Sequence, residues 1–185
     1  MRIIGICGRA GSGKDEVARI LTSSGFKRIG FADALKREVE LSWGNWPPEI
    51  PLQIVQALGG FQGSDVRRKP TPEPIRKLLQ FWGTNLRRAQ NENYWIDQLE
   101  ARILSSQSVS RWVVPDVRFP NEAALIHALG GQVWLVKRPF LASVGTPGHP
   151  TEQPDLLSAD LTLLNDSTLA ALSGAVERAL DELMR

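Results

Sequence analysis

Residues 8–15 read G-R-A-G-S-G-K-D, and they are the most informative stretch of the chain. It follows directly on the apolar run 3–7 and precedes a helical pattern of apolar residues over 17–21. The spacing G-x-x-x-x-G-K lets a glycine-rich turn direct successive backbone N–H groups at phosphate oxygens, and the N-terminus of the next helix adds its positive dipole end. A chance glycine-rich turn is the alternative, but the strand before it and the helix after it favour a phosphate-binding loop.

The loop also predicts which residues contact the ligand. Lys14 would reach the β- and γ-phosphates of a nucleoside triphosphate. Asp15 stands where such loops place a Ser or Thr hydroxyl on Mg²⁺, and a carboxylate is also a good hard-oxygen ligand, directly or through water. We therefore expect ATP and Mg²⁺ as ligands, with Asp15 on the metal. The expected nucleotide contacts are Gly8, Arg9, Ala10, Gly11, Ser12, Gly13, Lys14, Asp15 and Glu16.

Length and composition exclude several other classes of protein. A chain of 185 residues suits one α/β domain, and 22 basic against 20 acidic residues leave no basic stripe for a nucleic-acid polymer. The single cysteine, Cys7, lies in the apolar first strand, which indicates a buried core residue and fits a reducing cytoplasm. No apolar run approaches the roughly 18 residues of a membrane span. We expect a cytoplasmic protein without a membrane partner; the subunit count stays open, a homodimer included.

Apolar runs alternate with helical patterns along the chain. This order predicts an α/β fold of three αβα layers with a five-stranded parallel sheet. Asn121 is the expected N-cap of one helix, and Asp166 or Ser167 that of the last helix. The expected strands are 3–7, 28–31, 112–115, 133–137 and 161–164, and the expected helices are 17–21, 34–41, 75–86, 95–104, 122–129 and 169–183.

Two long stretches do not fit this pattern. Residues 43–74 hold six prolines and the basic cluster 67–69, and the stretch that begins at 138 and ends at 154 is rich in Pro, Gly and Thr. Long loops in a small domain are typical of lids and binding loops, and a disordered insertion is the alternative for each. We expect a single domain over 1–185, with a binding insertion at 43–74 and a lid at 138–154.

Charged residues follow the third expected strand. Asp116 comes directly after the run 112–115, and Arg118 follows two residues later. In an open parallel sheet the carboxyl ends of the strands are where ligands bind, so both should face the same crevice as Lys14. Asp116 can hold Mg²⁺ through water or accept the proton of an attacking oxygen, and Arg118 can clamp a phosphate. An ordinary surface ion pair is the alternative.

Weaker signals lie elsewhere in the chain. A glycine inside the helix predicted at 75–86 costs about 1 kcal/mol relative to alanine, so Gly83, next to Thr84, suggests the close approach of another backbone or a substrate. Arg88 could then hold an acceptor phosphate, although exposed arginines on helices are common. Asp33 follows the second strand and could be a mere N-cap. Asn165 follows the fifth strand, in a loop that could cradle a nucleoside base.

Taken together, these segments resemble the deoxynucleoside monophosphate kinase family of phages and bacteria, which belongs to the P-loop kinases. The resemblance covers nearly the whole chain, and the order of its motifs is more specific than any one of them. Asp after the loop lysine is characteristic of this family, whereas Glu16 stands where related proteins often have a hydroxyl. The motifs are G-x-x-G-S-G-K-D at 8–15, F-A-D-x-L-K at 31–36, L-Q-x-x-G-T-x-x-x-R at 79–88, D-V-R-F-x-N-E at 116–122, H-x-T-E at 149–152 and L-x-N-D at 163–166.

The resemblance implies a P-loop fold of the nucleoside monophosphate kinase type and transfer of the ATP γ-phosphoryl group to a deoxynucleoside 5′-monophosphate. Its catalytic residues would be Lys14, Asp116, Arg118 and Arg138, with Arg138 supplying transition-state charge from the lid. Mg²⁺ would be organised by Asp15 and Asp116. The substrate would be bound by Asp33, Lys36, Gly83, Thr84, Arg88, Arg118, His149 and Glu152.

Two alternatives remain. A P-loop kinase for another small acceptor, such as dephospho-coenzyme A or phosphomevalonate, would share the loop and the lid. A nucleotide-binding regulatory ATPase would instead hydrolyse ATP steadily without an acceptor and would bind a macromolecular partner. The arginines expected on the acceptor side favour a kinase for a small molecule.

Overall fold

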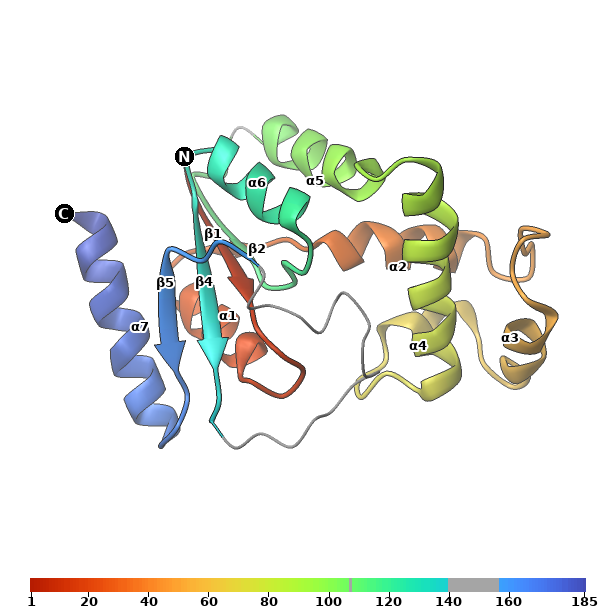
Figure 1. Cartoon of the computed structure of the whole chain (residues 1–185), viewed down its shortest axis with the longest axis horizontal. Coiled ribbons are helices and arrows are strands. Elements are labelled where there is room, and N and C mark those ends of the chain that lie inside the picture. The colour runs from red at the N-terminus through yellow and green to blue at the C-terminus, as the bar shows by residue number, and fades with distance from the viewer. Residues whose placement is uncertain (107, 140–156) are drawn as a thin grey trace. The chain divides into compact units, whose positions relative to one another are not determined.

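The computed structural model describes residues 1–106, 108–139 and 157–185 (Figure 1). The chain divides into two compact units. Unit 1 comprises Met1–Gly30 and Arg102–Arg185, and unit 2 comprises Phe31–Ala101. The insertion predicted at 43–74 falls wholly within unit 2.

Unit 1 is built on a five-stranded sheet in the order β2-β3-β1-β4-β5, and every pair of neighbouring strands is parallel. β1 lies in the middle, with Ile4 opposite Val113 of β3 and Ile6 opposite Trp134 of β4. The expected parallel sheet is therefore confirmed, and the carboxyl ends of all its strands share one edge. The strands are β1 (Arg2–Cys7), β2 (Lys27–Arg28), β3 (Arg111–Val114), β4 (Gln132–Lys137) and β5 (Leu161–Leu164).

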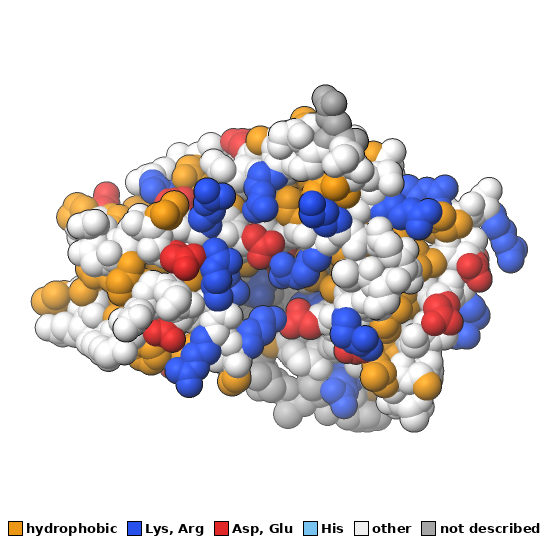
Figure 2. All heavy atoms as spheres, turned by 180° about the vertical axis from the view of Figure 1, so that it is seen from behind, with side chains coloured by type: hydrophobic (Ala, Val, Ile, Leu, Met, Phe, Trp, Pro, Cys, Tyr) orange, Lys and Arg blue, Asp and Glu red, His pale blue; other side chains and the backbone are white. Residues whose placement is uncertain are grey.

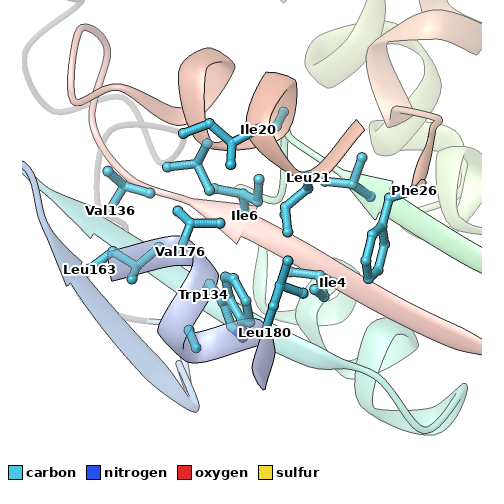
Figure 3. Close-up of a cluster of buried hydrophobic side chains, with 14 of the residues drawn as sticks. Ile4, Ile6, Ile20, Leu21, Phe26, Trp134, Val136, Leu163, Val176 and Leu180 are labelled. Carbon is cyan, nitrogen blue, oxygen red and sulfur yellow. The ribbon is translucent and has the colours of Figure 1, made fainter. Parts of the chain in front are cut away.

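Helices cover both faces of this sheet. α1 (Lys14–Ser23) and α7 (Leu169–Met184) bury their apolar residues against one face, together with Ile4, Ile6 and Trp134 (Figure 3). α6 (Pro120–Ala128) covers the opposite face, where a side chain at Gly5 would come within 3.1 Å of Ile126. The three expected layers are thus present.

Cys7 is fully buried, as its place in an apolar strand predicts. None of the helices in the described part of the chain is long and apolar enough to cross a membrane.

Several predicted boundaries are wrong, for identifiable reasons. The second strand ends at Arg28, and Phe31 begins a helix instead of completing the strand. α6 begins at Pro120 after the N-cap residue Phe119, so Asn121 lies inside the first turn. Proline suits that first helical position because it has no N–H to leave unpaired. The last helix is capped by Thr168, whose hydroxyl accepts a hydrogen bond from the N–H of Ala171 at 3.2 Å, and neither Asp166 nor Ser167 is the cap.

Unit 2 is helical and shows that much of 43–74 is not loop. Two short helices lie inside this stretch and a third begins before it ends. The single helix predicted over 75–86 is instead an α-helix that continues as a π-helix. The elements are α2 (Phe31–Leu41), α3 (Leu52–Ala57), the 3₁₀-helix η1 (Gly63–Arg67), α4 (Glu73–Gln80), the π-helix η2 (Phe81–Arg88) and the first residues of α5 (Tyr94–Ser105).

Candidate functional site

The loop between β1 and α1 has a conformation that only glycine adopts easily. Gly8, Gly11 and Gly13 have φ values of 144°, 79° and 105°. A Cβ atom on Gly8 would lie 2.5 Å from the carbonyl oxygen of Val136, and one on Gly13 would lie 2.5 Å from Nδ2 of Asn165. The glycine spacing seen in the sequence is therefore required both by backbone conformation and by close packing.

Two side chains of this loop indicate what it can bind. The ammonium of Lys14 donates to the carbonyl oxygens of Gly8 and Arg9, each at 2.6 Å. Ser12 is 1% exposed, and its hydroxyl has no hydrogen-bond partner within the described part of the chain. A buried hydroxyl without a partner is costly. The loop thus offers a cation and a hydroxyl donor beside the N-terminus of α1, which is where an anion is most favoured.

Asn165, predicted from its place after the fifth strand, is brought to the same loop. Its side-chain amide donates to the carbonyl oxygen of Ser12 at 2.9 Å, and its backbone N–H donates to Lys137 at the end of β4 at 2.7 Å. Asn165 therefore supports the backbone of the phosphate-binding loop. The prediction that its loop cradles a base is a separate one and stays a prediction.

The remaining residues of the loop lie at its open side. Arg9, Gly11 and Asp15 are exposed, and Ala10 is half-buried. Glu16 pairs with Arg19 on the outer side of α1, with Oε1 at 3.0 Å from Nε, and this hydrogen bond lowers the pKa of Glu16. The pairing gives no support to the prediction that Glu16 contacts the nucleotide, because a carboxylate repels phosphate.

Asp116 lies at the same edge of the sheet as the loop, because β3 and β1 are adjacent and parallel. Its carboxylate packs against Gly30, where a Cβ atom would lie 2.9 Å from both oxygens. Gly30 thus makes room for Asp116 at the end of the second strand. Arg118, two residues on, is exposed.

Glu122 is a further residue of this region, and the sequence indicated it only as part of the motif at 116–122. It is 2% exposed, and its Oε2 accepts hydrogen bonds from the backbone N–H groups of Arg118 at 2.7 Å and Phe119 at 3.1 Å. The carboxylate therefore fixes the backbone that carries Arg118. Its position as the third residue of the helix, where glutamate commonly reaches back to the N-cap, is the signal that could have identified it.

The residues expected to bind the acceptor, Arg118 of unit 1 apart, belong to unit 2 and to the predicted lid. Asp33 and Lys36 are half-buried in α2, and because the helix begins at Phe31, Asp33 is not its N-cap. Gly83 is buried, and a Cβ atom there would lie 3.1 Å from the side chain of Leu35, so the close approach predicted at this glycine is made by a packed side chain.

Thr84 and Arg88 lie on the π-helix, and Arg88 donates to the carbonyl oxygen of Glu92 at 3.1 Å. Arg138 is exposed directly after β4. His149 and Glu152 lie outside the described residues. On the face drawn in Figure 2, lysine and arginine side chains are interspersed with acidic ones.

A parallel sheet in the order β2-β3-β1-β4-β5, with a glycine loop and a lysine after its central strand, defines the P-loop class of nucleotide-binding proteins. Solved structures agree on the fold. Dephospho-CoA kinase from Campylobacter jejuni aligns with a TM-score of 0.54 at 17% identity, covering 99% of this chain and 98% of its own. The protein TT1252 from Thermus thermophilus aligns with a TM-score of 0.52 at 19% identity, covering 98% and 97%.

Sequence comparison identifies the family. The model of the deoxynucleotide monophosphate kinase family matches residues 64–176. A protein of Acanthamoeba polyphaga mimivirus named "Putative deoxynucleotide monophosphate kinase" is 30% identical over 201 residues, which cover 98% of this chain and 97% of that protein. The chain belongs to the deoxynucleotide monophosphate kinase family and is a kinase. The resemblance found in the sequence is thereby confirmed.

Proposed function

We propose that the protein transfers the γ-phosphoryl group of ATP to the phosphate of a deoxynucleoside 5′-monophosphate, which yields the diphosphate. Family membership supports the reaction, and the loop around Lys14 is the structural observation that carries the proposal. The attacking group is already an anionic phosphate oxygen, so no base has to remove a proton from it. The reaction requires positioning and neutralisation of charge.

Unit 1 supplies the groups for the phosphate donor. Lys14 is held over two carbonyl oxygens, and a bound triphosphate offers its ammonium anionic oxygens in their place. The unpartnered hydroxyl of Ser12 can donate to the same anion. The bonds from the Lys14 ammonium to these carbonyl oxygens already have a charged donor, and a phosphate oxygen adds the attraction of an opposite charge, so the exchange favours the nucleotide-bound state.

The residues present fit a magnesium ion. Mg²⁺ usually takes one or two carboxylates and completes its shell with water and substrate phosphates. Within the described residues no group of three or more His, Cys, Asp or Glu side chains forms a cage, and Asp15 and Asp116 supply carboxylates at the same edge of the sheet. The ion would neutralise charge on the phosphates, and these two residues would hold it.

Unit 2 supplies groups for the acceptor. We assign Arg88 to binding of the acceptor phosphate. Asp33, Lys36 and Thr84 would line the acceptor pocket, and all four residues lie on α2 or the π-helix. From unit 1, Arg118 would bind the acceptor phosphate and Arg138 would supply charge to the transition state. His149 and Glu152 are proposed to contact substrate.

The test is a panel of acceptors incubated with ATP and Mg²⁺ and scored by ADP release together with identification of the phosphorylated product, which is the diphosphate for a nucleoside monophosphate. The panel holds the deoxynucleoside and ribonucleoside monophosphates, dephospho-coenzyme A and phosphomevalonate. Phosphorylation of one or more deoxynucleoside monophosphates supports the proposal. Transfer only to one of the last two acceptors, or steady ATP hydrolysis without transfer to any acceptor, contradicts it.

A further inference from the structure

Glu38 of α2 accepts hydrogen bonds from three side chains of unit 2 that are distant in sequence. Its Oε1 lies 3.0 Å from Nε1 of Trp82 and 2.5 Å from Nε of Arg87, and its Oε2 lies 2.9 Å from the hydroxyl of Tyr94. Arg87 reaches the same Oε1 through Nη2, also at 2.5 Å. One carboxylate thus ties α2 to both ends of the π-helix and to the start of α5.

The π-helix is what allows Trp82 and Arg87 to meet at one oxygen. In an α-helix of about 3.6 residues per turn, side chains five residues apart point about 140° away from each other. In a π-helix the backbone bonds join residues five apart, as from the N–H of Ala89 to the carbonyl oxygen of Thr84, so such residues lie one above the other. Trp82 and Arg87 are five residues apart and both donate to Oε1 of Glu38.

A carboxylate at position 38 suits these donors better than any neutral group. Trp82 is fully buried, so its indole N–H needs an acceptor inside the protein. Arg87 brings a positive charge that Glu38 balances, and its guanidinium also lies 5.2 Å from the ring of Tyr94. An ionised carboxylate accepts at both oxygens, whereas an amide accepts at only one.

We propose that Glu38 is a positioning residue for the acceptor nucleotide. By holding Trp82 and Arg87, it keeps the segment Phe81–Arg88 in the π-helical register that places Thr84 in the acceptor pocket and presents Arg88 to the acceptor phosphate. The inference rests on the proposed function, in which Thr84 and Arg88 bind the acceptor. Glu38 itself touches no substrate and acts through the backbone of the π-helix.

The same arrangement gives two adjacent arginines different roles. Arg87 is held by Glu38, whereas Arg88 points from the next position of the helix and donates to the carbonyl oxygen of Glu92. If the segment reverted to an α-helix, each side chain after the change would turn by about 100° for every residue of register lost. The side chain of Arg88 would then point in a different direction from the one that it has while Glu38 holds the π-helix.

The test compares Glu38→Gln with Glu40→Gln. Glu40 lies on the same helix and pairs with Arg67 at 2.8 Å, so the control variant also breaks one ion pair of α2 but none on the π-helix. We expect Glu38→Gln to raise the KM for the deoxynucleoside monophosphate about tenfold, the equivalent of one charge-assisted hydrogen bond, while the KM for ATP stays within about twofold. Glu40→Gln should leave both KM values unchanged.

Hydrogen exchange of the ligand-free variants provides a readout that needs no activity. Faster exchange of the amides of residues 81–89 in Glu38→Gln, without the same change in Glu40→Gln, supports the assigned contact. Faster exchange with an unchanged acceptor KM means that Glu38 only stabilises the fold, and this overturns the inference. Unchanged exchange overturns it as well.

If Glu38→Gln does not fold, Tyr94→Phe takes its place, because it removes only the hydrogen bond to Oε2 of Glu38. This variant should also raise the acceptor KM, by a smaller factor. An unchanged acceptor KM in Tyr94→Phe overturns the inference as well. A wild-type protein that phosphorylates no deoxynucleoside monophosphate would refute the proposed function instead. The exchange experiment would then still report whether Glu38 holds the π-helix.

Discussion

The side-chain amide of Asn165 donates to the carbonyl oxygen of Ser12 at 2.9 Å, so a residue that follows β5 supports the loop that follows β1, 153 positions earlier in the chain. The same amide occupies the space that a side chain on Gly13 would need. The backbone N–H of Asn165 also donates to the carbonyl oxygen of Lys137, so the shape of the phosphate-binding loop depends on the carboxyl ends of both β4 and β5.

Replacing Asn165 by Ala should weaken ATP binding. The carbonyl of Ser12 loses its donor, and a lost hydrogen bond of this kind costs about 0.5–1.5 kcal/mol, which corresponds to roughly a two- to twelvefold rise in the Kd for ATP. Isothermal titration calorimetry measures the Kd for ATP. Asn45→Ala, at an exposed position of unit 2, is the control and should bind ATP like the wild type. An unchanged Kd in Asn165→Ala would show that the loop keeps its shape without this bond.

Gly13→Ala should abolish ATP binding, whereas Gly60→Ala should not. Both glycines have positive φ, 105° and 86°, so alanine is strained at each by about 1–2 kcal/mol. The two sites differ in the room that they leave for a side chain. A Cβ atom on Gly13 would lie 2.5 Å from Asn165, whereas one on Gly60 would have no atom within 4 Å. Both variants should therefore lose stability in urea unfolding through backbone strain, Gly13→Ala more than Gly60→Ala because of the added clash, and only Gly13→Ala should lose nucleotide binding. Equal ATP affinity in the two would refute the role given to the crowded loop.

Arg138→Ala should lower kcat far more than it weakens ATP binding. Arg138 is exposed just beyond β4, and we assign it to charge that develops in the transition state. An interaction made only in the transition state affects kcat and kcat/KM equally and leaves the Kd unchanged. Steady-state kinetics and direct ATP titration separate these quantities, with Arg178→Ala on α7 as the control. A parallel loss of kcat and ATP affinity would instead assign Arg138 to binding.

The sequence predicted the parts of the fold that are encoded locally. Four of the five predicted strands match observed strands closely, and the second overlaps β2 only at Arg28. The loop at 8–15 could be identified because its glycines, its lysine, the strand and the helix are contiguous. The error at Asn121 arose because a polar residue near the start of a helix was taken as its N-cap. The error at Phe31 arose because an apolar residue was counted with the strand before it, whereas it begins the next helix. At α6 the true boundary depends on Glu122 and Pro120, which satisfy the helix start from inside the helix.

The acceptor side was less predictable because its contacts are not local. Glu38 meets its three partners 44, 49 and 56 positions away, and no spacing rule connects residues so far apart. The π-helix was also missed, because its composition does not distinguish it from the α-helix that precedes it. The glycine at 83 did signal a close approach, but only the structure shows that Leu35 makes it.

Tyr94 should make the protein less stable in alkaline solution. Burial raises the pKa of Tyr94, and the hydrogen bond to the carboxylate of Glu38 raises it further. The unfolded chain loses this proton near pH 10, while the folded protein keeps it to higher pH. The folded state then binds more protons than the unfolded state, so the free energy of unfolding falls as the pH rises through the folded pKa. Below about pH 9 this contribution is fully present.

The measurement is urea unfolding at a series of pH values between about 8.5 and 11.5, around the ordinary tyrosine pKa, in the wild type and in Tyr94→Phe. Phenylalanine cannot ionise, so the free energy of unfolding of the wild type should fall more steeply with pH than that of the variant, and titrating lysines affect both curves alike. Tyr94 is the only tyrosine of the chain, so its ionisation can also be followed by absorbance. Parallel stability curves would show that the phenol ionises equally easily in the folded and unfolded chain, and that the bond to Glu38 does not hold its proton.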